Sequence, residues 1–149
     1  MLTRSTGLLK YEHADGVISE NLIAFCSDDG IYLNRAANSV IRHNTLIGTS
    51  GIDVRYPESI ARVDANIVDG EIRARDHGQY SGDGNETGNA RSLFENPARL
   101  DLRWRRLPAL VATEPGLDLC GAEWTARSPA GAFRDFQACS TVEKPAGKQ

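Results

Sequence analysis

One short pattern recurs in the first half of the chain, and its period constrains the fold more than any other feature. The pattern is an asparagine with an apolar residue three positions before it and another two positions after it. The asparagines stand 23 and then 22 residues apart. A fixed period in this range is typical of solenoid proteins, in which each repeat forms one coil. The three copies are Ile18–Ile23, Ile41–Leu46 and Val63–Val68, with Asn21, Asn44 and Asn66.

A second, shorter unit lies after each copy of the first. Its copies begin with glycine and continue with alternating apolar and polar residues: Gly30–Leu33, Gly51–Val54 and, one residue looser, Gly70–Ala74. Alternation with period two, rich in valine and isoleucine, predicts β-strands. The sequence therefore predicts an all-β solenoid of about three and a half coils, from about residue 7 to about residue 76.

The register of the repeat predicts which side chains stack. Coils in a β-solenoid lie one strand spacing apart, about 4.8 Å, so equivalent residues form columns. The asparagines should form a ladder at a turn, where an amide bonds both the local backbone and the next rung. Two apolar columns should point inward: Ile18, Ile41 and Val63 in one, and Leu9, Ile31, Ile52 and Ile72 in the other.

Composition narrows the functional classes. The chain has 149 residues, 40% of them hydrophobic and 25% charged, which suits one globular domain. The net charge of −3 argues against a general nucleic-acid binder. We expect no membrane span, since no apolar run approaches 18 residues, and the first residues show no secretory signal.

The start of the chain raises a question of capping. A solenoid needs a cap, because its end coil otherwise exposes an unpaired strand edge and an apolar core. The first strand pattern begins almost at the first residue, without an amphipathic helix before it. We expect either missing N-terminal coils of a longer solenoid or a partner that covers this end, including end-to-end self-association.

Beyond Asp76 the repeat is expected to stop. Residues 77–92 contain four glycines and almost no large apolar side chain, which predicts a long loop. Within it, Asp83–Gly88 copies the first half of a calcium-binding loop, with oxygen ligands at alternate positions. The closing carboxylate is missing, because Phe94 stands at the twelfth position. The sequence therefore predicts no required cofactor and leaves calcium as a possibility beside a plain glycine-rich turn.

The following segment resembles a known superfamily. Gly88-Asn89, Leu93–Ala98, Leu100–Arg103 and Leu107–Leu110, with Asp118–Gly121 and Gly131–Phe133 further on, are similar to the closing segment of right-handed parallel β-helix proteins of the pectate-lyase-like superfamily. The resemblance spans about residues 16–136. This chain differs from the superfamily pattern in two places. At Glu95-Asn96-Pro97 the usual acidic residue before the first phenylalanine is missing, and Arg134 stands where glutamate is common. The resemblance implies a right-handed parallel β-helix, and an extracellular or periplasmic location.

This layout divides the chain into three parts. Residues 1–92 would hold the coils and the loop, 93–139 would pack along the side of the coils and cover their C-terminal end, and 140–149 would be a disordered tail. Trp104 and Trp124 are expected in the core or cap. A disulfide between Cys120 and Cys139 is one alternative for this segment and two free thiols the other, while Cys26 fits a small buried residue.

The residues between the inward ones point outward and form two polar columns on one sheet face. Arg55 and Arg75 would stand one coil apart, an unfavourable pair unless an anion lies between them. Forked guanidinium groups match carboxylates and sulfates, which predicts an acidic polysaccharide such as a uronan as ligand. The columns are Lys10, Tyr32, Asp53 and Arg73 in one, and Glu12, Asn34, Arg55 and Arg75 in the other.

The superfamily resemblance suggests roles on this face. In its lyases an arginine or lysine abstracts a proton beside a uronate carboxylate, which would make Arg73 or Arg75 the base. Asp53 would hold a metal ion or a sugar hydroxyl, and Lys10, Tyr32, Asn34 and Arg55 would bind substrate. The alternative interpretation is an ordinary solvated sheet face. Two functions stay open: a carbohydrate-associated module, catalytic or not, and a structural or adhesive solenoid segment.

A second acidic cluster, Ser27–Gly30, contains the pair Asp28-Asp29. Paired carboxylates serve glycoside hydrolysis, but the sequence is also ordinary turn chemistry, and the accompanying hydrolase motifs are missing. We interpret it as a turn. His13 and His43 have no acid or nucleophile at a recognisable spacing, so the sequence predicts neither a triad nor a zinc site.

Overall fold

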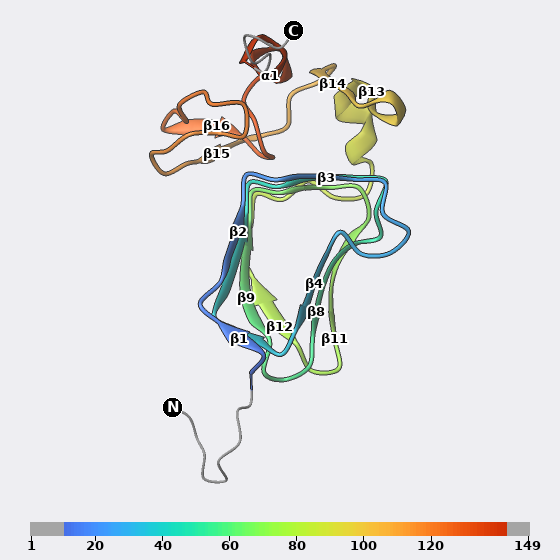
Figure 1. Ribbon diagram of the computed structural model, residues 1–149, viewed down its shortest axis with the longest axis vertical. Coiled ribbons are helices and arrows are strands. Elements are labelled where there is room, and N and C mark those ends of the chain that lie inside the picture. The colour runs from blue at the N-terminus through green and yellow to red at the C-terminus, as the bar shows by residue number, and fades with distance from the viewer. Residues whose placement is uncertain (1–10, 143–149) are drawn as a thin grey trace, which may run out of the picture.

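The computed structural model describes residues 11–142. Residues up to about 89 form a β-solenoid, and residues 90–142, called the tail from here on, pack against its side (Figure 1). Three parallel sheets run along the solenoid, which makes about three coils. Sheet A contains β2 (Val17–Ser19), β6 (Ser39–Arg42), β9 (Ile60–Asp64) and β12 (Gln79–Ser81). Sheet B contains β3 (Leu22–Ala24), β7 (Thr45–Ile47) and β10 (Ile67–Val68), and sheet C contains β4 (Ile31–Asn34), β8 (Gly51–Arg55) and β11 (Glu71–Arg75).

A fourth, shorter pairing closes the outline between sheets C and A. It joins β1 (His13–Ala14) to β5 (Ala36–Ala37), again in parallel. In Figure 1 the coils lie over one another, with sheets A, B and C on three sides of the outline. The all-β solenoid predicted from the repeat is therefore confirmed.

The predicted inward columns are confirmed by the strand register. Ile41 of β6 pairs with Ile18 below and Val63 above, in sheet A. In sheet C, Ile52 pairs with Ile31 and Ile72. The central members, such as Ile41 and Ile52, are fully buried. Burial of one such side chain contributes about 1.5–3 kcal/mol, so the stacked columns are a main source of stability. Leu9, predicted for the second column, lies outside the described residues.

The asparagine ladder is also confirmed. Asn44 accepts hydrogen bonds at Oδ1 from the backbone N–H and the side-chain amide of Asn21, both at 3.1 Å. Asn66 accepts the same two bonds from Asn44, at 2.9 and 3.0 Å. The amide of Asn44 also donates to the carbonyls of Ile18 and Arg42. Each amide thus bonds its own turn and an adjacent coil, which satisfies polar groups that would otherwise be buried without partners.

The repeat continues past Asp76, contrary to the prediction of a loop over residues 77–92. β12 pairs with β9 in sheet A, and Glu86 makes a parallel bridge with Ile67. Asn85 accepts from the N–H and amide of Asn66, at 2.9 and 3.0 Å, and is a fourth rung of the ladder. Asp83-Gly84-Asn85, for which the sequence left open calcium binding or a plain glycine-rich turn, repeats the turn of the earlier coils. Gly84 takes a left-handed φ of +76° where His43 has +52°.

The outer face of sheet B is apolar, and the tail covers it. Thr45, Ile47 and Ile67 are fully buried although they point away from the coil interior. They pack against tail residues that include Leu93, Phe94, Leu102 and Phe133. Figure 1 shows the whole tail over β3. The tail thus packs along the side of the coils, and the protein has a second core between sheet and tail.

The tail itself is built from short elements. Two antiparallel pairs carry it: β13 (Phe94–Asn96) with β14 (Asp101–Trp104), and β15 (Leu110–Ala112) with β16 (Arg127–Pro129). Two 3₁₀ turns, Ala90–Leu93 and Pro97–Arg99, flank β13, and α1 (Phe136–Val142) follows β16. The predicted disordered tail from Ser140 is thus wrong at its start, because α1 extends to Val142. Within residues 11–142, no helix has the length and apolar character that a membrane crossing requires.

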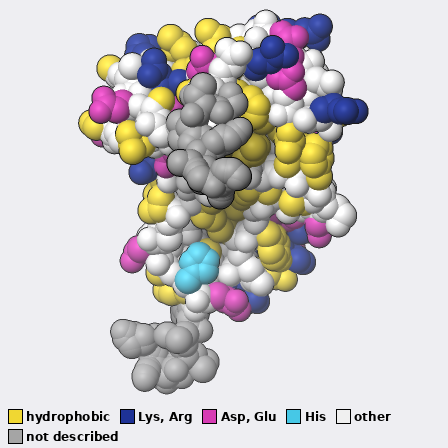
Figure 2. Space-filling model, turned by 45° about the horizontal axis from the view of Figure 1, so that its top comes forward, with side chains coloured by type: hydrophobic (Ala, Val, Ile, Leu, Met, Phe, Trp, Pro, Cys, Tyr) yellow, Lys and Arg dark blue, Asp and Glu magenta, His cyan; other side chains and the backbone are white. Residues whose placement is uncertain are grey.

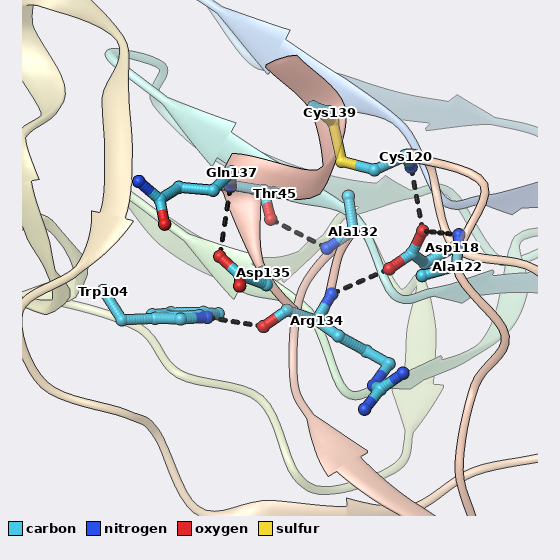
Figure 3. The surroundings of a disulfide bond; sticks show 10 residues. All are labelled: Thr45, Trp104, Asp118, Cys120, Ala122, Ala132, Arg134, Asp135, Gln137 and Cys139. Carbon is cyan, nitrogen blue, oxygen red and sulfur yellow. Dashed lines mark hydrogen bonds between the residues drawn. A yellow bond between two sulfur atoms is a disulfide. The ribbon is translucent and has the colours of Figure 1, made fainter. Parts of the chain in front are cut away.

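Hydrogen bonds around Asp118 give the tail its shape (Figure 3). Its carboxylate accepts the backbone N–H groups of Cys120, Ala122 and Arg134, each at 2.9 Å. The carbonyl of Arg134 accepts the indole N–H of Trp104 at 2.6 Å. One buried carboxylate therefore holds two loops and the start of the α1 segment together, as charge-assisted hydrogen bonds are the stronger kind.

Of the two alternatives left open for Cys120 and Cys139, the structure has the disulfide, which links α1 to the Asp118 loop. Cys26, predicted as buried, is free and only half-buried. Both tryptophans lie in the predicted core or cap: Trp124 is buried, and Trp104 packs on Phe94 with ring centroids 5.1 Å apart. On the face shown in Figure 2, basic and acidic side chains are interspersed over the tail.

Candidate functional site

The outward face of sheet C carries six residues of the two predicted polar columns. The placement predicted for Glu12 beside Asn34 is wrong, because Glu12 lies next to the β1–β5 pairing and donates its N–H to the carbonyl of Arg35 at 2.8 Å. Asp53 of β8 pairs with Tyr32 of β4 and with Arg73 of β11. In the second column Arg55 pairs with Asn34 and Arg75. The structure therefore brings these six predicted site residues together in the predicted order. Lys10, the seventh, lies outside the described residues, so its predicted binding role stays a prediction.

Asp53 is buried, although the sequence predicted an exposed carboxylate. Its side chain has no exposed surface, and its Oδ2 accepts from Nε of Arg75 at 2.8 Å. Nη2 of Arg73 lies 3.8 Å from the same oxygen. A carboxylate can remain charged when buried only if it is paired in this way, since desolvation costs several kcal/mol. The arginines cover Asp53, which excludes direct contact with a large ligand in this arrangement.

Two polar atoms in this layer have no protein partner among residues 11–142: Oδ1 of Asp53 and Nε of Arg73. Each unsatisfied buried group costs about 1–3 kcal/mol, so such atoms are rare in a purely structural ion pair. These two atoms therefore remain without a hydrogen-bond partner from the described residues, beneath the exposed ends of the arginines.

The acidic turn Ser27–Gly30 joins this site, which sequence reasoning did not predict. Asp29 accepts from Nη2 of Arg73 at 2.9 Å and is itself largely buried. The turn lies level with the next coil, because Gly30 donates its N–H to the carbonyl of Gly51 at 2.8 Å. The alignment of Gly30 with Gly51 in the repeat was the available signal, since it places Asp29 at the start of sheet C.

Arg55 has its own partners, so the predicted repulsion between Arg55 and Arg75 is offset. Its Nε donates to the Asp76 carboxylate, and its Nη1 donates to the Tyr32 hydroxyl at 3.2 Å. These hydrogen bonds raise the pKa of Arg55, and the same ion pair lowers the pKa of Asp76. The ring of Tyr56 lies under the guanidinium, 4.7 Å from its centre. The neighbouring Arg35 donates a hydrogen bond to Oδ1 of Asn34 at 3.3 Å.

A cavity of about 510 Å³ opens over these side chains. Three guanidinium groups and two carboxylates line it, and the charge of Asp53 lies beneath. The charges are thus nearly balanced, unlike a bare basic patch. The lining residues are Asp28, Asp29, Tyr32, Arg55, Arg73 and Arg75.

The arginine N–H groups that could bind a ligand in the cavity are those that do not already bind a carboxylate of the protein. Arg73 uses Nη2 on Asp29, and Arg75 directs Nε and Nη2 at Asp53. The Nη1 groups of both have no partner among residues 11–142. They are donors held in fixed orientation by buried acceptors, which is the arrangement that binds carboxylates or hydroxyls with specificity.

The ion pairs oppose the catalytic role suggested for Arg75. A general base must lose its proton near neutral pH, and the hydrogen bond to Asp53 instead raises the pKa of Arg75 above its ordinary value. The geometry therefore suits binding better than proton abstraction. Among the described residues no three histidine, cysteine, aspartate or glutamate side chains gather as a metal site would require.

Comparison with known proteins returns no match, whether to family models, to curated proteins or to solved structures. The parallel solenoid is therefore established by the structure itself, and kinship with the pectate-lyase-like superfamily stays a prediction.

Proposed function

We propose that the protein is a carbohydrate-associated solenoid that binds an acidic, uronan-type polysaccharide along sheet C. The observation that supports this is the cavity over β8 and β11, where Arg55, Arg73 and Arg75 project from two successive coils. A chain of uronate units presents carboxylates at regular intervals, and guanidinium groups at regular coil spacing suit such a ligand. The proposal implies an extracellular or periplasmic location, where such polymers occur.

The unused Nη1 groups would donate to a ligand carboxylate, and Tyr32 would contact the sugar ring. Asp53 acts as a positioning residue, because it holds the arginine side chains from below. We propose binding without catalysis on this face, since the raised pKa of Arg75 keeps its guanidinium protonated. Because the lining charges nearly cancel, affinity should depend on salt only weakly, in contrast to an exposed basic patch.

Calorimetric titration with galacturonate oligomers tests the proposal, with a neutral glucan oligomer as the ligand control. The double variant Arg55→Ala with Arg73→Gln should weaken binding by tenfold or more, as each charge-assisted bond is worth about 1.5–3 kcal/mol. Arg103→Ala is the matched control, because this arginine lies on β14, is exposed and is paired with Asp101. Arg75→Ala is avoided, since it would strand the buried Asp53 charge at a cost of about 3–5 kcal/mol.

A structural function is the second candidate, and one observation favours it. The ion pairs tie one coil to another: Arg75 of β11 to Asp53 of β8, and Arg73 to Asp29 before β4. Arginines whose only role is to link neighbouring coils would form the same ion pairs. If no acidic glycan binds while the double variant unfolds more easily than the Arg103→Ala control, the structural function replaces the binding function.

A further inference from the structure

The two ends of the solenoid carry strands whose outer edges are unpaired within residues 11–142. At the N-terminal end these strands are β2, β3 and β4, and at the C-terminal end they include β11 and β12. Figure 1 looks along the coils and shows the tail beside their outline, so the tail covers neither end. Open strand edges pair readily with further strands, and a solenoid end needs something to cover it.

The backbone of sheet A indicates which groups point out from the two edges. The carbonyl of Gly16 accepts an N–H of β6 at 2.9 Å, so Gly16 faces β6. Successive residues of a strand direct their backbone groups to opposite sides, and Val17 therefore faces the free N-terminal edge. At the other end Gln79 donates its N–H at 3.1 Å to a carbonyl that precedes β9, so Tyr80 faces the free C-terminal edge.

The register within the chain fixes how these two edges would meet. Val17 pairs with Val40, and Val40 pairs with Arg62 in the next coil. Arg62 pairs with Ser81 of β12, the last strand of sheet A. One further step of the same register places Val17 of a second copy over Ser81. Its N–H then meets the carbonyl of Tyr80, as the N–H of Val40 meets the carbonyl of the coil before it.

The asparagine ladder has a direction, and its two ends are complementary. Each asparagine donates its backbone N–H and its side-chain amide to Oδ1 of the asparagine in the next coil. Among residues 11–142, Oδ1 of Asn21 therefore has no donor and the backbone N–H of Asn85 has no acceptor. Asn85 of one copy would make the same two bonds to Asn21 of the next. Two like ends would bring acceptor to acceptor or donor to donor.

The apolar columns also end with partly exposed side chains. Ile18 and Ile23 end them on the N-terminal side and Ile72 on the C-terminal side, whereas Ile41 and Ile52 within the columns are fully buried. Stacking a second copy would bury these end residues, at about 25 cal/mol per Å² of apolar surface. In sheet C one strand position remains between β11 and the β4 of the next copy. The repeat predicts the segment around Leu9 for that position, and Leu9 lies outside the described residues.

We propose that the protein associates head to tail, with the C-terminal end of one solenoid pairing with the N-terminal end of the next. The partner is a second copy of this chain, because each end continues the strand register, the ladder direction and the apolar columns of the other. A contact between two different surfaces does not close at the dimer, so association continues into filaments as concentration rises. This proposal does not depend on polysaccharide binding along sheet C.

The test is analytical ultracentrifugation of the full 149-residue chain from micromolar to millimolar concentration. The proposal expects the average mass to rise past that of the dimer as concentration increases. A monomer mass at every concentration would overturn it, since the ends would then be covered within one molecule. A mass that levels off at the dimer would also overturn it, because pairing of two like ends stops there.

Variants at the two edges identify the ends that meet. Val17→Pro removes the N–H that would pair with Tyr80, at the first residue of an edge strand, where proline is tolerated. Tyr80→Pro blocks the C-terminal edge in the same way. Val17→Ala and Tyr80→Ala are the matched controls, because they shorten the side chains and keep the N–H groups, and both should still associate.

Each proline variant alone should remain monomeric, whereas an equimolar mixture of the two should double in mass and grow no further. Each variant supplies the end that the other lacks. Association of Val17→Pro alone or of Tyr80→Pro alone, or a mixture that stays monomeric, would contradict head-to-tail pairing. Circular dichroism and thermal unfolding confirm that each variant is folded, and the concentration series of the unchanged chain decides the proposal even where a proline variant is not.

Discussion

The coils and the tail are stabilised in different ways. In the coils each residue repeats the environment of the residue one coil away. The hydrogen bond of the asparagine ladder, for example, occurs three times between four asparagines. In the tail each contact occurs once: Asp118 binds three backbone N–H groups, and one disulfide ties α1 in place. A repeat distributes stability over many equivalent contacts, whereas an irregular segment depends on a few specific ones.

The largest expected contrast between the regions comes from two glycines. Gly51 begins β8 with φ +113°, and an added Cβ would lie 2.0 Å from the carbonyl oxygen of Glu71 in the next coil. Gly121 in the tail has φ +84° and open space around it. Gly51→Ala should therefore destabilise the protein by more than about 4 kcal/mol, and Gly121→Ala by about 1 kcal/mol. Denaturant unfolding measures both, and equal losses would contradict the close coil spacing at Gly51.

The asparagine ladder supplies the next contrast, this time within the coils. Asn44 is fully buried, and its loss would leave several backbone and amide groups without partners. Asn44→Ala should cost about 3–4 kcal/mol, whereas Asn21→Ala at the exposed end of the ladder should cost about 1 kcal/mol. Urea unfolding of the two variants checks the difference. A smaller loss of stability for Asn44→Ala than for Asn21→Ala would mean that the buried rungs of the ladder do not stabilise the coils.

The disulfide should affect the tail and leave the coils unchanged. Cys139→Ser opens a loop that spans 19 residues, which in the chain-entropy view costs about 3 kcal/mol. Hydrogen exchange should show faster exchange for α1 and the Asp118 loop, with unchanged protection in β6, β7 and β8. Loss of protection throughout the coils would show that the two regions unfold together.

The smallest expected effect is a pH dependence at the junction of the two regions. Because burial lowers the pKa of His43 in the folded state, the unfolded state binds a proton more readily. Stability should therefore decrease as pH falls below about 6.5, the ordinary pKa of histidine, and level off below the folded-state pKa. His43→Asn should flatten this dependence, because it removes the group whose pKa differs between the folded and unfolded states. Thermal unfolding between pH 7.5 and pH 5 provides the measurement, and an unchanged slope in the variant would reject the assignment.

The coils and the tail also differ in how much of their structure could be predicted from the sequence. The period alone gave the register of Ile41 and Ile52 and the order of the sheet C columns, because stacking one coil on the next leaves little freedom. The start of a further coil, over residues 79–86, was missed because Gly82 stands where Val63 and Ile41 occupy the inward column, and Gly84 stands at the turn, so its composition resembled a loop. Asn85, 19 residues after Asn66, was the remaining trace of the repeat.

The site was only partly predictable for a related reason. Alternation indicates which side chains leave the sheet, but not whether neighbours cover them, so Asp53 was placed correctly and its burial was missed. The surroundings of His43 depend on tail residues far away in sequence, such as Gly131 and Trp124. No spacing in the sequence relates these positions to His43, because the tail has no period.

The most direct test of the account is NMR of the arginine side-chain Nε–H signals during titration with a galacturonate oligomer. The account predicts that the signals of Arg55, Arg73 and Arg75 shift together and saturate at one ligand concentration, while those of Arg103 and Arg127 in the tail stay in place. Shifts confined to the tail arginines, or no shift at saturating ligand, would contradict polysaccharide binding along sheet C.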